Sequence, residues 1–150
     1  QTETRIPTLF RTIHSVMSLP KPKLNLLACW DALHSSGHFY VPMTKYLPTV
    51  ATMGGVVMDN SAFVTIPGEP ISELGMKMKD YGRKLGFEHV GIVGLTNDHL
   101  GYILTGDEFR LGGYESCASL YGPDLGDLVV SASESVMTNL AQPNQNLGSR

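Results

Sequence analysis

The fold is decided by the stretch AFVTIPGEPISELGMKMKDYGRKLGFEHVGIVGL, which occupies residues 62–95. Residues 62–66 have the length and the β-branched, apolar content of a strand, and the PGEP that follows them at 67–70 is a sharp break. Apolar side chains then recur every three or four positions over 71–85, which predicts an amphipathic helix. Residues 90–95 are a continuous apolar run, which is typical of a strand buried on both faces.

Strand, helix and strand in this order predict a βαβ unit, whose crossover returns the second strand parallel to the first. Pro70 suits the first turn of the helix, where its missing N–H costs nothing. The carboxyl ends of parallel strands meet at one edge of a sheet, and open α/β sheets bind ligands there. Five polar residues that are separated in the sequence are therefore expected at that edge: Glu69, Asn97, Asp98, His99 and Tyr102.

Plainer roles for these residues stay open on the residues alone. Glu69 can simply be favoured by the dipole at a helix N-terminus. Asn97 and Asp98 are a common turn pair, His99 beside them can be an ordinary surface residue, and Tyr102 can be a packing residue.

Regular elements are also predicted on both sides of the βαβ unit. Residues 50–58 read as a strand that forms a hairpin with 62–66 across the turn at 59–61. A second apolar stripe at helical spacing covers 125–140, with Asp124 as a plausible N-cap.

The expected organisation divides the chain into three parts. Residues 1–48 are an irregular, apolar N-terminal segment, in which 9–17 is the one place for a short helix before a short buried helix over 24–33. Residues 49–142 form an α/β lobe, and 143–150 are a polar tail. The predicted fold class is α/β, with a βαβ-containing mixed sheet flanked by helices that makes up one lobe of a larger domain.

Composition limits the class of protein. A chain of 150 residues has room for one domain or one lobe, and a hydrophobic content of 42% indicates a packed core. The net charge is −3, from 11 basic and 14 acidic residues without a basic run, which argues against nucleic acid as a partner. No apolar run approaches the ~20 residues of a transmembrane segment. Charged residues make up only 17%, which hints that part of the surface is covered by something else.

The cysteine content and the N-terminal residue bear on processing and location. Two cysteines, Cys29 and Cys117, are too few for a disulfide-dense scaffold. The sequence does not distinguish one disulfide between them from two buried thiols. The chain begins with Gln1 rather than Met, as in a mature or excised segment. We therefore expect an extracellular or secreted protein.

Five short motifs, in their order and spacing, resemble the neutral/alkaline (non-lysosomal) ceramidase family: TIPGEP at 65–70, GLTND at 94–98, GYI at 101–103, GGYE at 112–115 and SLYGP at 119–123. The likeness runs from about Val50 to Leu140, is nearest to the compact bacterial ceramidase-like proteins, and covers the C-terminal part of the catalytic domain. Residues 1–48 match no family.

The resemblance implies a zinc-dependent amide hydrolase, which cleaves N-acylsphingosine-type amides with metal-activated water. By position in the motifs, it implies that Glu69 and Tyr102 are zinc ligands. It also implies that Tyr114 is a catalytic residue in contact with the reacting amide. Tyr121, beside Gly122 and Pro123, is expected only to serve the turn.

The sequence departs from the family at the histidines. The family's other two zinc ligands are histidines from the N-terminal part of a longer domain. Here His34 and His38 have the wrong context and are expected to be loop residues, while His14 and His89 have no supporting pattern. Zinc is therefore expected only where histidines from elsewhere complete the site.

Two functions follow from these expectations. In the first, the chain is part of a zinc hydrolase for an amide-linked lipid, completed by a missing N-terminal half, a second chain or another copy of itself. In the second, it is a non-catalytic ceramidase-like module for assembly or binding. Glu69, Tyr102 and Tyr114 favour the first, and the absent histidines favour the second for this chain alone. The apolar stripes over 90–95 and 125–140 also predict a large interface.

Overall fold

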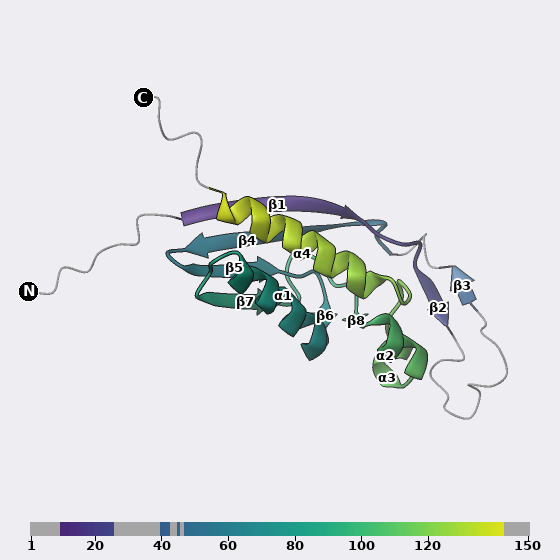
Figure 1. The fold of residues 1–150 in the computed structure, drawn as a ribbon. Helices are drawn as coiled ribbons and strands as arrows, with labels where there is room; N and C mark the ends of the chain where they lie inside the picture. The colour runs from purple at the N-terminus through teal and green to yellow at the C-terminus, as the bar shows by residue number, and fades with distance from the viewer. Residues whose placement is uncertain (1–9, 26–39, 43–44, 46, 143–150) are drawn as a thin grey trace, which may run out of the picture.

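The computed structural model describes residues 10–25, 40–42, 45 and 47–142 (Figure 1). A four-stranded sheet with the order β1-β4-β5-β7 runs through this part of the chain. Its strands are β1 (Phe10–Ser18), β4 (Val50–Met58), β5 (Ser61–Thr65) and β7 (His89–Val93). Two helices, α1 (Ser72–Lys84) and α4 (Leu125–Ala141), contact each other and lie along one face of the sheet (Figure 1).

The predicted hairpin and βαβ unit are both present. β4 and β5 pair antiparallel around a turn at Asp59 and Asn60, and β5 pairs parallel with β7 after the crossover through α1. The sheet is therefore mixed and flanked by helices, which confirms the predicted α/β class.

β1 corrects the short helix that the sequence suggested over 9–17. The strand pairs antiparallel with the whole of β4, from Phe10 opposite Met58 to Ser18 opposite Val50. Ile13 and Met17 are partly or fully buried, and His14 and Val16 are exposed, which is a period of two. Residues 13 and 17 lie on one face of a helix as well as of a strand, so their spacing did not distinguish the two.

Two short strands between β1 and β4 in the sequence form a separate two-stranded sheet. β2 (Lys23–Asn25) pairs antiparallel with β3 (Tyr40–Pro42). The short helix expected over 24–33 is therefore wrong at its start, and residues 26–33 lie outside the described part of the chain.

Pro70 belongs to a strand, not to the first turn of α1 as predicted. Glu69–Pro70 forms β6, which pairs parallel with β8 (Tyr102–Ile103), and α1 follows with Ile71 as its N-cap. The backbone N–H groups of Glu69 and Ile71 donate to the carbonyls of Gly101 and Ile103, at 3.0 and 3.1 Å. The missing N–H of Pro70 falls between these two bonds, where the ladder needs no donor.

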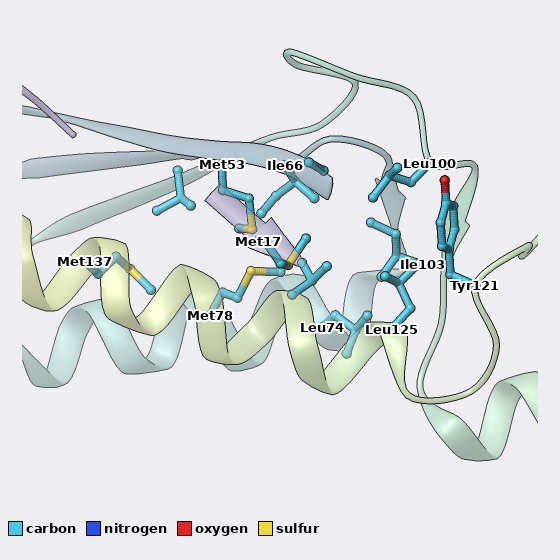
Figure 2. Packing of buried hydrophobic residues seen from close by; sticks show 13 residues of the cluster. Met17, Met53, Ile66, Leu74, Met78, Leu100, Ile103, Tyr121, Leu125 and Met137 are labelled. Atoms are coloured by element: carbon cyan, nitrogen blue, oxygen red, sulfur yellow. The ribbon is translucent and has the colours of Figure 1, made fainter. Parts of the chain in front are cut away.

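The core lies between the sheet and the two helices, and it already covers the apolar stripe of α4 (Figure 2). Leu125, Val129 and Met137 of that helix are completely buried. The expectation that this stripe needs cover from outside the chain is therefore wrong. Asp124 does precede α4 as predicted, although its side chain makes no capping hydrogen bond.

β7 is less buried than predicted, because it is an edge strand of the sheet. Its five residues are partly buried or exposed, and Val93 and Leu95 are 41% and 54% exposed. An apolar run alone does not reveal whether a strand has one neighbour or two.

Two short helices complete the described fold. α2 (Gly106–Leu111) and α3 (Tyr114–Cys117) contact each other between β8 and α4. Cys117 is disulfide-bonded, and Cys29 lies outside the described residues. Within the described part of the chain, no helix has the length and apolar content to span a membrane.

Candidate functional site

The β6–β8 pair places Glu69 directly beside Tyr102. The two residues are partners in the parallel register, although 33 positions separate them in the sequence. The backbone just before the pair is anchored as well, because the N–H of Leu100 donates to the carbonyl of Pro67 at 2.8 Å and the Leu100 side chain is buried. The structure thus brings together the two residues that the resemblance implies as zinc ligands.

Gly68 allows the two segments to approach this closely. A Cβ atom at Gly68 would lie 2.8 Å from the carbonyl oxygen of Gly101 and 2.9 Å from the side chain of Ile103. Both distances are shorter than van der Waals contact, and one of the neighbours is backbone. The glycine of the PGEP motif is therefore needed for the spacing between Glu69 and Tyr102.

We expect Gly68→Ala to lower the free energy of unfolding by about 1–3 kcal/mol, because the new methyl group overpacks the β6–β8 pair. Gly75→Ala is the matched control. A Cβ at Gly75 meets nothing within 4 Å, so the exchange in α1 should stabilise by about 0.5–1 kcal/mol through helix propensity. Urea denaturation of both variants measures the difference, and equal shifts of one sign would contradict the role given to Gly68.

Tyr102 lies in an electronegative environment. The Glu69 carboxylate, partial desolvation and the neighbouring Tyr114 all raise the pKa of the Tyr102 phenol. The rings of Tyr102 and Tyr114 meet edge to face, with centroids 5.7 Å apart. Tyr114, at the start of α3, is 72% exposed, so it reaches this site without being part of the core.

His99 joins the same group of side chains. Its Nε2 lies 3.9 Å from Oε1 of Glu69, and its Nδ1 accepts a hydrogen bond from the N–H of Gly101 at 3.1 Å. Asp98 is turned toward the backbone, because its Oδ1 accepts from the N–H of His99 at 2.8 Å. The sequence placed His99 at this edge but gave no sign that it faces Glu69 in particular.

Asn97 does not join this group. Its side-chain amide lies 3.4 Å from the hydroxyl of Thr65 and 3.5 Å from the carbonyl of Thr52, on the four-stranded sheet. Its backbone has a left-handed φ of 69°, which asparagine adopts more readily than most residues. Asn97 therefore shapes the loop after β7.

Tyr121 serves the core rather than the turn that was expected. Its ring is 3% exposed and packs with Leu100 and Ile103 in the core (Figure 2). Its hydroxyl donates to the carbonyl of Pro48 at 3.0 Å, and burial raises the pKa of the phenol to about 12. Of the two tyrosines in this region, only Tyr114 belongs to the candidate site.

Glu69 and Tyr102 can supply part of the ligand set of a metal site, but not all of it. Within the described residues, no three His, Cys, Asp or Glu side chains are grouped so that they could hold a metal ion together. His14 and His89 are exposed on β1 and β7, and His34 and His38 lie outside the described residues. Glu69 and Tyr102 supply two oxygen donors in register, whereas catalytic zinc sites use three protein ligands.

An open groove of about 510 Å³ adjoins Glu69 on the side of α1 and β7. Its walls include the apolar side chains of Ile71, Met76 and Leu95, with Lys79 as the cation among the lining residues. Met76 and Leu95 are more than half exposed, so the groove presents apolar surface to solvent. An apolar molecule that enters this groove would lie next to Glu69.

Comparison with known proteins finds similarity to neutral ceramidases. No family model matches the chain. Neutral ceramidase A of Dictyostelium discoideum is 28% identical over 102 residues, which is 65% of this chain and 14% of that protein. Neutral ceramidase B of the same organism is 28% identical over 83 residues, which is 52% of this chain and 12% of that protein.

Two solved structures share the fold of this chain. A neutral ceramidase from Pseudomonas aeruginosa matches with a TM-score of 0.74 and 12% identity, over 89% of this chain and 28% of that one. A ceramidase complexed with C2 matches with a TM-score of 0.68 and 13% identity, over 89% and 30%. The chain therefore spans less than a third of the length of each of these proteins.

Proposed function

We propose that this neutral ceramidase-like region, which corresponds to part of those longer proteins, forms one wall of the active site of a zinc-dependent amide hydrolase. The observation that carries the proposal is the convergence of Glu69, Tyr102 and Tyr114 from three separate segments. These are the residues to which the ceramidase-like motifs give chemical roles. A module kept only for its shape has no need of all three.

Zinc is the cofactor that this donor set supports best. Glu69 and Tyr102 would hold it from this chain, and histidines from elsewhere would complete the coordination. The negative charge of Glu69 that raises the Tyr102 pKa is a reason for a cation to bind between them. When bound, zinc supplies a Lewis acid that polarises the amide carbonyl and lowers the pKa of a water molecule.

The chain's own contribution to catalysis comes from Tyr114. Its phenol is exposed and its ring meets that of Tyr102 edge to face, so it can approach a substrate that reaches Glu69. A phenolic O–H at that position donates a hydrogen bond to the oxygen of the reacting amide. This bond becomes stronger as negative charge develops on that oxygen.

The substrate class we propose is an amide-linked lipid. The groove beside Glu69 offers apolar walls at Ile71, Met76 and Leu95, which suit a hydrocarbon chain. The disulfide at Cys117 supports an extracellular or secreted location, because disulfides persist in oxidising compartments.

A non-catalytic binding module is the second candidate. It is favoured by the two-donor set, because one glutamate and one tyrosine do not hold a catalytic zinc ion. The two functions predict different results when the missing histidine ligands are supplied, either by an N-terminal half of the same protein or by a second chain. A hydrolase would then cleave its substrate, whereas a binding module would not.

We therefore expect the 150-residue chain alone to bind zinc weakly and to release no fatty acid from acyl-amide lipids. Addition of a polypeptide that carries the histidine half should restore both zinc binding and hydrolysis. Glu69→Gln is the matched control, since it keeps the shape of the side chain but weakens it as a ligand. Tight zinc binding without hydrolysis in the completed protein would favour the binding module. Full activity of the chain alone would show that His34 or His38 supplies ligands.

A further inference from the structure

We propose that His99 is a positioning residue for the Glu69 carboxylate, a proposal that rests on the proposed role of Glu69 as a zinc ligand. Glu69 begins β6 and His99 lies in the loop before β8, and their side chains meet with Nε2 and Oε1 3.9 Å apart. His99 would hold one carboxylate oxygen by donating a hydrogen bond to it. The other oxygen is then left for the cation.

The tautomer of His99 follows from its backbone partner. The N–H of Gly101 donates to Nδ1 at 3.1 Å, so Nδ1 must carry the lone pair and not the proton. In the neutral ring the proton is then on Nε2, the nitrogen that faces Glu69. The imidazole therefore presents a donor to the carboxylate oxygen.

The same tautomer keeps His99 from serving as a metal ligand. A ligating histidine offers a nitrogen lone pair to the metal. Here the lone pair on Nδ1 is used by the N–H of Gly101, and Nε2 bears hydrogen. Carboxylates that bind a metal are commonly held by a further hydrogen bond, whose loss weakens metal binding. His99 fits that supporting role for Glu69.

The loop that carries His99 is fixed to the strand that carries Glu69. Leu100, the next residue, is buried, and its N–H donates a hydrogen bond to the carbonyl of Pro67. The N–H of Glu69 donates to the carbonyl of Gly101 at 3.0 Å. His99 thus lies directly before two anchored backbone positions. The separation of 3.9 Å is longer than a hydrogen bond, and we expect the two partly exposed side chains to rotate into hydrogen-bond distance when zinc binds.

Two variants separate the donor from the ring. His99→Phe keeps an aromatic ring and removes the donor, whereas His99→Gln keeps an N–H donor on a shorter side chain. We expect the zinc affinity of the protein completed by its histidine-bearing part to fall about 10-fold or more in His99→Phe and to recover largely in His99→Gln. His89→Phe is the control, because His89 is an exposed histidine on β7 away from this cluster.

Nitrogen-15 NMR of the histidine side chains supplies the second measurement. At about pH 8.5, where imidazoles are neutral as a class, His99 should show the Nε2–H tautomer both without and with zinc. A zinc-bonded nitrogen signature at His99 would overturn the proposal, and so would unchanged zinc affinity in His99→Phe while Glu69→Gln reduces it. Unchanged affinity in Glu69→Gln would instead contradict the proposed role of Glu69 itself.

Discussion

Leu74→Ala is expected to lower the free energy of unfolding by about 2–5 kcal/mol, which can remove most of the stability of a domain of this size. Leu74 is completely buried in α1, and its Cδ1 atom would lie 3.2 Å from a Cβ built on Gly126 of α4. The side chain thus packs tightly between the two helices. Truncation would leave a cavity that the flanking helices cannot close without losing their packing on the sheet.

Leu111→Ala is the matched control for this prediction. It is the same chemical change, but Leu111 is 73% exposed at the end of α2, so the expected effect is within about 0.5 kcal/mol. Urea denaturation followed by circular dichroism measures both. Similar losses in the two variants would show that α1 does not pack on α4 as described.

The part of the fold that was predictable is the part set by local pattern. The strand over 50–58 is bounded as expected, and β5, α1, β7 and α4 each lie within two residues of their predicted ends. Their periodicities are clear because each buries one face. The parallel pairing of β5 with β7 then follows from the length of the crossover, and so does the meeting of Glu69 with Tyr102 at one edge.

The errors arose where pairing over a long distance decided the structure. β1 is a strand because it pairs with β4, which begins 32 residues after β1 ends, and no local signal reports such a partner. Pro70 resembles a helix start in isolation, and only the position of β8 shows that its missing N–H is needed by no partner. Burial of β7 was overestimated for the same reason.

The place of the candidate site was predictable from the βαβ unit, which put Glu69 and Tyr102 at one edge of the sheet. The chemical roles of Glu69, Tyr102 and Tyr114 came only from the resemblance, and they stay predictions although the structure shows the three residues as neighbours. His99 was placed at the correct edge, but its partner depends on side-chain direction. The difference between Tyr114 and Tyr121, one exposed and one buried, also depends on tertiary packing.

That difference gives the second large effect we expect. In the enzyme completed by its histidine-bearing part, Tyr114→Phe should slow turnover by roughly 10²–10³-fold, the usual loss on removal of one oxyanion donor. Stability should change little, because the hydroxyl belongs to a side chain that is 72% exposed and the edge-to-face ring contact with Tyr102 is retained. Steady-state kinetics on an acyl-amide lipid, with zinc content measured in parallel, separates loss of catalysis from loss of the cofactor.

Tyr121→Phe should show the opposite behaviour and serves as the matched control. It removes a buried hydroxyl that donates to the carbonyl of Pro48, so unfolding should become easier by about 1 kcal/mol while turnover of the folded enzyme is unchanged. The same atom is deleted in both variants, and only its surroundings differ. If the two variants lose rate equally, or if Tyr114→Phe loses only stability, the catalytic role belongs to another residue and Tyr114 is a packing partner of Tyr102.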